Sequence, residues 1–240
     1  MTINALLSQV AFIQKGEGKD LVFLHGYMAN KESFALQIGY FSRYYRVTAI
    51  DFLGFGKSGP LPSAYSVEDY ADWTKRVLDG LGVCNPHVVA HSFGCRVAVK
   101  LGAKYVGFWD KMVLTGPAGV ILPRGLGYTI KVGAYRLCKK ILPTYAEKKF
   151  GSKEYRTLSP LMKESYKKIV NEDLRADASR VASEVLLIEG TDDRVTTLAE
   201  AKAYQKAFPC ARLVTISGGH FAFVDSPLAF NILTEEFLYD

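Results

Sequence analysis

The sequence lacks the marks of a secreted, membrane-spanning or metal-binding protein. Its first twenty residues have no basic start, no long apolar run and no small-residue cleavage site, so we expect no signal peptide. No run approaches the roughly 18 consecutive apolar residues of a transmembrane helix, and we expect no membrane span. The scattered cysteines show no CxxC pair and no metal-ligand spacing, which predicts free thiols in a reducing cytoplasm and no metal site. They are Cys84, Cys95, Cys138 and Cys210.

The sequence lacks a strong excess of one charge sign, except in one segment. The 240 residues are 49% apolar and 22% charged, as in an ordinary globular domain. Residues 120–180 carry 14 Lys and Arg against 6 Asp and Glu, whereas the rest of the chain carries 16 against 18. Such a basic segment is either a solvated helix face or a site that recruits an acidic partner, such as an acyl carrier protein or an anionic acyl thioester. We expect no nucleic-acid binding, because no recognised module is present.

Short β-branched runs alternate with helical patterns along most of the chain, which predicts an α/β fold with a mostly parallel sheet flanked by helices. Each run is almost continuously apolar and is followed by Gly, Ser or Asp, as expected of strands buried on both faces. The predicted strands are 21–25, 47–52, 87–91, 111–115, 185–189 and 212–216. The predicted helices are 66–81, 93–105, 197–207 and 227–239.

Residues 120–180 break this alternation. They contain no clear strand, and their helical patterns are interrupted by proline and glycine. Because about 60 residues is too long for a structureless loop in a compact domain, we interpret this segment as a helical lid. The predicted core is therefore formed by 1–119 and 181–240.

The strongest chemical signal is the pentapeptide Ala90-His91-Ser92-Phe93-Gly94, between a predicted strand and a predicted helix. This context is typical of a nucleophile elbow, the sharp turn that lifts a serine hydroxyl above the edge of a sheet. Small residues at both ends let the strand and helix backbones approach each other. Alanine replaces the usual first glycine of G-x-S-x-G, which is the mildest departure from that pattern.

A serine nucleophile needs a general base that is oriented by an acid. His220 follows the last predicted strand and is the expected base, because His25 and His87 fit structural positions and the His91 side chain is expected to point away from Ser92. The acid follows the strand 185–189. The spacing Gly-x-x-Asp favours Asp193, with Asp192 as the alternative.

Two backbone N–H groups are needed to stabilise the oxyanion of such a reaction. Phe93, directly after the serine, is one expected donor. Tyr27, in the loop after the first predicted strand, is the other, with Met28 as the alternative. We expect Met28, Phe221 and Tyr128 to contribute to the substrate pocket.

Five sequence blocks together resemble the α/β-hydrolase superfamily, over about residues 20–119 and 184–240. They are LVFLHGY, DFLGFGKSG, AHSFG, GTDDRVTT and GGHFAFVDSP. The resemblance is closest to the lidded branch of small esterases and C–C bond hydrolases. In that family DFLGFGKSG is a structural loop, and we assign it no chemistry.

The resemblance implies a serine hydrolase without a cofactor but says little about its substrate. We expect it to cleave a carboxylic ester or thioester of a small apolar or aromatic acyl group. Serine rather than aspartate at the elbow points to acyl chemistry. The alternatives are a C–C hydrolase of the meta-cleavage type, an acyl-carrier-linked thioesterase, and a non-catalytic ligand-binding member. Phe221-Ala222-Phe223 stands where, in that family, the meta-cleavage enzymes carry a tryptophan after the catalytic histidine.

Overall fold

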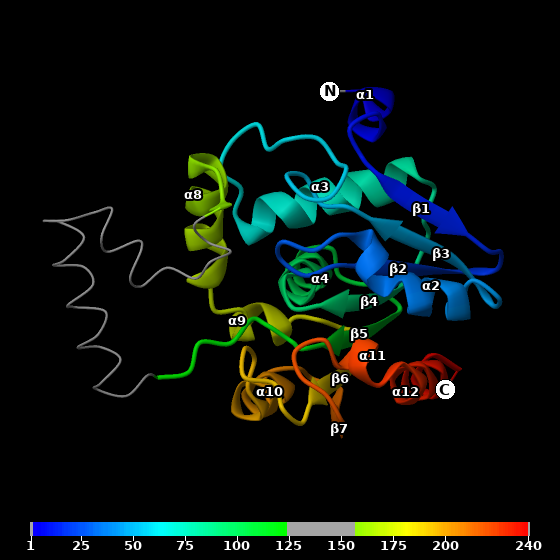
Figure 1. The fold of residues 1–240 in the computed structure, drawn as a ribbon, viewed down its shortest axis with the longest axis vertical. Helices are drawn as coiled ribbons and strands as arrows, with labels where there is room; N and C mark the ends of the chain where they lie inside the picture. The colour runs from blue at the N-terminus through cyan, green and yellow to red at the C-terminus, as the bar shows by residue number, and fades with distance from the viewer. Residues whose placement is uncertain (1, 124–156, 240) are drawn as a thin grey trace, which may run out of the picture.

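A seven-stranded sheet forms the centre of the computed structural model, which describes residues 2–123 and 157–239 (Figure 1). The strand order is β1-β3-β2-β4-β5-β6-β7, and only β1 runs antiparallel to its neighbour. The strands are β1 Phe12–Lys15, β2 Lys19–Leu24, β3 Tyr45–Ile50, β4 His87–His91, β5 Lys111–Thr115, β6 Glu184–Gly190 and β7 Ala211–Ile216. Because six strands are parallel, their carboxyl ends meet at one edge of the sheet.

Helices cover both faces of this sheet and bury two apolar layers (Figure 1). One layer is formed with α1 Ile3–Leu7, α3 Val67–Gly80, α4 Phe93–Lys104, α8 Pro160–Val170, α9 Arg175–Ala178 and α10 Leu198–Gln205. The other is formed with the 3-10 helix η1 Lys31–Phe34 and with α2 Ala35–Phe41, α11 Ala222–Asp225 and α12 Pro227–Tyr239. The predicted α/β class is confirmed.

All six strands and all four helices predicted from the sequence are present, with shifts of one or two residues at their ends. The first strand, β1, was missed. Its residues are mostly exposed, with a Gln and a Lys among them, so they show no buried apolar run. It lies at the edge of the described sheet, where one side of the strand pairs with no other described strand.

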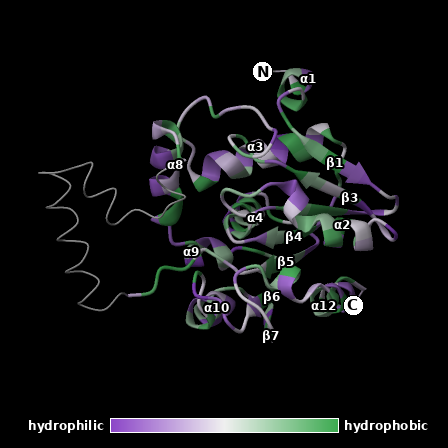
Figure 2. Cartoon of the chain, viewed as in Figure 1, coloured by the Kyte–Doolittle hydropathy of each residue, from purple (hydrophilic) through white to green (hydrophobic). Residues whose placement is uncertain are grey.

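Part of the predicted lid lies among the described residues. There α8 and α9 occupy 160–170 and 175–178, as the helical interpretation predicts, while 124–156 lie outside the described residues. Hydrophilic and hydrophobic residues both occur along α8 (Figure 2). Hydrogen bonds join it to the core, among them those from Tyr27 Oη to the Met162 carbonyl at 3.1 Å and from the Tyr65 N–H to Ser165 Oγ at 2.7 Å. The division into a core and a lid stays a prediction.

The loop after β3 is held by a buried aspartate. Asp51 accepts the N–H groups of Lys31 and Lys57 at 2.7 and 2.8 Å, and the Lys31 ammonium lies 2.9 Å from its carboxylate. Gly56 has a φ of +53°, and a Cβ there would lie 2.2 Å from the Asp51 carboxylate. This loop supports the backbone and contributes no group to the site described below.

The sequence predicts free thiols and no membrane span. Cys84, Cys95 and Cys210 are free thiols, and Cys138 lies outside the described part of the chain. Within 2–123 and 157–239, every helix is too short or too polar to cross a membrane.

Candidate active site

Ser92 occupies a sharp turn between β4 and α4. Its φ and ψ are +49° and −105°, a conformation that L-residues rarely adopt and that only the surrounding structure can maintain. The turn is fixed by the Ser92 N–H, which donates to the Thr115 carbonyl on β5 at 3.1 Å. Gly94 is required, because a Cβ there would lie 2.2 Å from the Leu24 carbonyl oxygen. The predicted strand–turn–helix context is therefore present around this serine.

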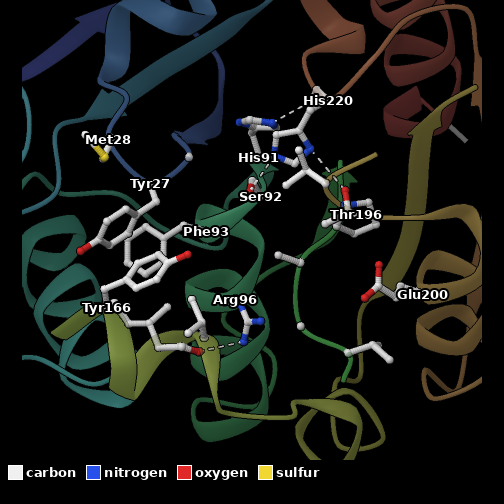
Figure 3. Close-up of a pocket in the computed structure, with 18 of the residues that line it drawn as sticks. Tyr27, Met28, His91, Ser92, Phe93, Arg96, Tyr166, Thr196, Glu200 and His220 are labelled. Atoms are coloured by element: carbon white, nitrogen blue, oxygen red, sulfur yellow. Dashed lines mark hydrogen bonds between the residues drawn. The ribbon is translucent and has the colours of Figure 1, made fainter. Parts of the chain in front are cut away.

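Three side chains from separate loops form one chain of hydrogen bonds above the sheet edge. Ser92 Oγ lies 3.0 Å from Nε2 of His220, and the two side chains face each other in Figure 3. The other ring nitrogen, Nδ1, lies 2.7 Å from Asp193 Oδ2. The residues follow β4, β7 and β6 respectively, so the parallel sheet brings together positions up to 128 residues apart.

The side chain of Asp193 has no exposed surface and is held by several donors. Its carboxylate accepts the N–H groups of Val195 and Thr196 at 2.7 and 3.0 Å and the Thr196 hydroxyl at 2.8 Å. Burial alone favours the protonated acid, but the bonds from His220 and Val195 outweigh it and lower the pKa of Asp193 to about 2. Asp192, the alternative acid, is exposed, and from the described residues its carboxylate accepts one 3.3 Å bond, from Thr191. The geometry thus favours Asp193.

The other three histidines are buried. Nε2 of His25 accepts the Phe52 N–H at 3.1 Å, and its Nδ1 donates to the Gly26 carbonyl, so this ring braces two loops. Burial lowers the pKa of both His25 and His87 to about 4, which keeps them neutral.

His91 has a contact that the sequence did not reveal. Its ring packs 4.7 Å from the His220 ring, and its Nε2 donates to the His220 carbonyl at 2.9 Å. Figure 3 shows the two rings beside each other. His91 thereby supports the backbone that carries the His220 side chain. This pairing depends on the β7 loop, 129 residues away, and has no local sequence signal.

A cavity of about 440 Å³ opens beside Ser92 and His220. It is lined mainly by apolar residues, including Met28 and Phe221 as expected, and both are partly exposed at 44% and 45%. Tyr128, the third expected pocket residue, lies outside the described residues. The arrangement offers a mainly apolar chamber with the Ser92 hydroxyl at its wall.

The two expected backbone donors flank this cavity. Tyr27 follows β2, and Phe93 is the first residue of α4, where a helix leaves its N–H groups without partners of its own. Their rings pack edge to face at 5.5 Å, which fixes the two backbone segments relative to each other. The positive end of the α4 dipole also points toward Ser92.

Two charged residues of the cavity were missed by sequence analysis. Arg96 lies four residues after Ser92 on α4, and Glu200 lies on α10. Neither stands in a motif, and their positions at the cavity depend on the folded arrangement of the helices. Figure 3 shows both among the lining residues.

Comparisons with known proteins agree with this architecture. The model of the alpha/beta hydrolase family matches residues 21–231, and the chain belongs to this family. It is 24% identical to the AB hydrolase superfamily protein YisY of Bacillus subtilis (strain 168) over 92% of both chains. It is 27% identical to a 2-hydroxymuconate semialdehyde hydrolase of Pseudomonas putida, over 93% of this chain and 88% of the relative. An esterase from Exiguobacterium antarcticum superposes with a TM-score of 0.77 at 22% identity, over 96% of both chains.

Proposed function

We propose that this hydrolase cleaves a carboxylic ester or thioester through Ser92, His220 and Asp193. The observation that carries the proposal is the continuous hydrogen-bond chain among them, 3.0 Å from Ser92 Oγ to His220 and 2.7 Å from His220 to Asp193. Serine is activated only when a base lies within hydrogen-bond reach and is itself oriented by a third group. Both conditions are met at this sheet edge.

The reaction has two steps. His220 Nε2 takes the proton of Ser92 as Oγ attacks the carbonyl carbon, and the tetrahedral oxyanion accepts the N–H groups of Tyr27 and Phe93. The C–O or C–S bond then breaks, and His220 gives its proton to the leaving alcohol or thiol. His220 then takes a proton from water as the water oxygen attacks the acyl carbon. The bond to Ser92 Oγ breaks, and His220 returns the proton to Oγ as the acid leaves. The Asp193 carboxylate holds the His220 tautomer and stabilises its cation.

The cavity supports an apolar acyl group as substrate. Met28 and Phe221 lie at its wall, and the remaining lining is also mostly apolar. Apolar lining with a few placed polar groups is typical of small-molecule sites. We therefore propose that a small aliphatic or aromatic acyl group occupies this cavity while Ser92 attacks its carbonyl carbon.

Removal of the serine hydroxyl tests the proposal. Ser92→Ala should abolish hydrolysis of p-nitrophenyl hexanoate and labelling by a fluorophosphonate probe, with a melting temperature close to that of the wild type. Ser63→Ala, an exposed loop serine, is the matched control and should keep both activities. Undiminished turnover or labelling in Ser92→Ala would refute the assignment.

A C–C hydrolase of the meta-cleavage type is the second candidate. The similarity to a 2-hydroxymuconate semialdehyde hydrolase over most of both chains favours it, whereas Phe221-Ala222-Phe223 in place of a tryptophan disfavours it. If the protein hydrolyses 2-hydroxymuconate semialdehyde faster than any ester, the C–C hydrolase is the correct candidate. An acidic carrier partner at the basic segment and a cytoplasmic location stay predictions, and most of that segment lies outside the described residues.

A further inference from the structure

Arg96 places a buried positive charge in the wall of the cavity that contains Ser92. Ser92 directly precedes α4, Arg96 lies in the first turn of that helix, and both side chains line the same cavity. Arg96 is buried, with only 8% of the residue exposed. Charged groups are seldom buried without an opposite charge, because they lose the hydration that stabilises them in water.

The hydrogen bonds of Arg96 involve one part of its guanidinium. Nη1 donates to the carbonyls of Ile169 and Glu172, at 3.0 and 2.8 Å, near the C-terminal end of α8 (Figure 3). These bonds tie α8 to α4. Within residues 2–123 and 157–239, no protein group accepts a hydrogen bond from the edge formed by Nε and Nη2. This edge has the two parallel N–H groups that a carboxylate accepts in a bidentate pair.

The carboxylates around Arg96 are engaged by other groups. Glu172 pairs with Lys100 at 2.6 Å, and Asp173 pairs with Arg175 at 2.9 Å. Glu200, across the cavity, accepts the N–H and the hydroxyl of Thr197 at the start of α10. Among the described residues Arg96 therefore forms no ion pair, although it is the cation of the cavity wall.

We propose that Arg96 binds a carboxylate of the substrate, so that the natural ester or thioester has an apolar acyl chain ending in a carboxylate. This inference rests on the proposed function and names its substrate class. The apolar lining would accept the chain, Ser92 would attack one end, and the Nε–Nη2 edge would hold the other. Arg96 thus selects the substrate, in addition to its structural bonds with α8.

Two matched esters distinguish the proposed substrate-binding role of Arg96 from its structural role. The substrates are mono-p-nitrophenyl adipate and p-nitrophenyl hexanoate, which have equal carbon chains and differ in a terminal carboxylate against a methyl group. The ratio of their kcat/KM values is measured for the wild type, Arg96→Gln and Arg96→Lys. Lys104→Gln removes one charge from an exposed position on the same helix and is the control.

The wild type should favour the adipate ester. Arg96→Gln should lower the adipate-to-hexanoate ratio by roughly 30-fold or more, as expected when one partner of a buried charge pair is removed. Arg96→Lys should keep part of the preference, and Lys104→Gln all of it. A purely structural arginine would lower both activities equally, and an unchanged ratio in Arg96→Gln would overturn the proposal.

Two further outcomes keep the hypotheses distinct. If Arg96→Gln does not fold, the wild-type ratio decides alone: a preference for adipate supports the inference, and equal or lower activity than on hexanoate overturns it. If the wild type hydrolyses neither ester and is not labelled at Ser92 by a fluorophosphonate, the proposed function itself fails. Good turnover of hexanoate without a preference for adipate overturns only the role of Arg96.

Discussion

Two loops at the carboxyl edge of the sheet are built around a buried aspartate in the same way. Asp51 follows β3 and Asp193 follows β6, and both side chains have no exposed surface. Each accepts two backbone N–H groups of its own or a neighbouring loop. In both, these bonds offset the cost of burial and lower the pKa of the carboxyl group.

The two loops differ in the cation that completes them. Asp51 pairs with the ammonium of Lys31, whose pKa is raised above its usual value, so the pair is charged at every physiological pH. Asp193 pairs with the imidazole of His220, and the second nitrogen of that ring faces Ser92. The same arrangement of backbone N–H donors therefore stabilises a loop at Asp51 and orients the general base His220 at Asp193.

Among these variants, Asp193→Asn should show the largest functional difference between the two loops. The amide keeps the shape of the side chain but cannot stabilise the His220 cation and favours the wrong tautomer, so kcat should fall roughly 10³–10⁴-fold. Steady-state hydrolysis of p-nitrophenyl hexanoate measures this. Asp192→Asn is the control, and comparable losses in both variants would contradict the assignment of Asp193.

Asp51→Asn should produce the opposite result, a loss of stability with little change in kcat. Among the described residues it leaves the buried Lys31 ammonium with Glu32, 3.0 Å away, as its remaining carboxylate partner. We expect a cost of about 3 kcal/mol, at the lower end for a broken buried pair, which is a drop of roughly 6–12 °C in melting temperature. Melting curves measure this, and kcat is normalised to fluorophosphonate-titrated sites.

The surface pair of Asp79 with Lys75 supplies the control for that experiment. It spans one helical turn on α3, and Asp79→Asn should cost well under about 1 kcal/mol. A loss of kcat in Asp51→Asn at full site occupancy would show that the β3 loop takes part in the reaction.

The sequence predicted the parts of this molecule whose signals are local. Six strands were visible as short apolar runs, and Ser92 stood in a recognisable turn sequence with Gly94 two positions later. The edge strand β1 was missed because its residues are mostly exposed. The short helix α2 was missed because seven residues, three of them buried, carry too little periodicity to be distinguished from a loop.

The missed site residues depend on distant parts of the chain. His91 pairs with the backbone of His220, and Arg96 bonds to carbonyls 73 and 76 residues further on. Thr196, which donates to Asp193, occupies an ordinary turn position. Each of these roles can be inferred only when the sheet order and the position of α8 are known, and no local sequence pattern contains that information.

Glu189 is a third buried carboxyl group. It lies on β6, four residues before Asp193. It is fully buried like the two aspartates, but neither of its oxygens has a hydrogen-bond partner among the described residues. Without donors, burial dominates, and together with the nearby Asp193 charge it raises the pKa of Glu189 to about 9. The donors, rather than the depth of burial, therefore decide whether a carboxyl group in this sheet is ionised.

Glu189→Gln tests that conclusion through stability. The folded state of the wild type holds this proton more tightly than the unfolded state, so between pH about 4.5 and about 9 folding takes up a proton and stability falls as pH rises. Glutamine does not titrate. From pH 5 to pH 8, the free energy of unfolding of the variant should therefore rise by about 2 kcal/mol relative to that of the wild type. This change is smaller than the upper limit of about 1.4 kcal/mol per pH unit. Urea unfolding at both pH values measures the difference, with Glu184→Gln at the exposed start of β6 as the control. A pH-independent difference would mean that Glu189 is ionised in the folded protein, and that a partner satisfies it as the backbone satisfies Asp51 and Asp193.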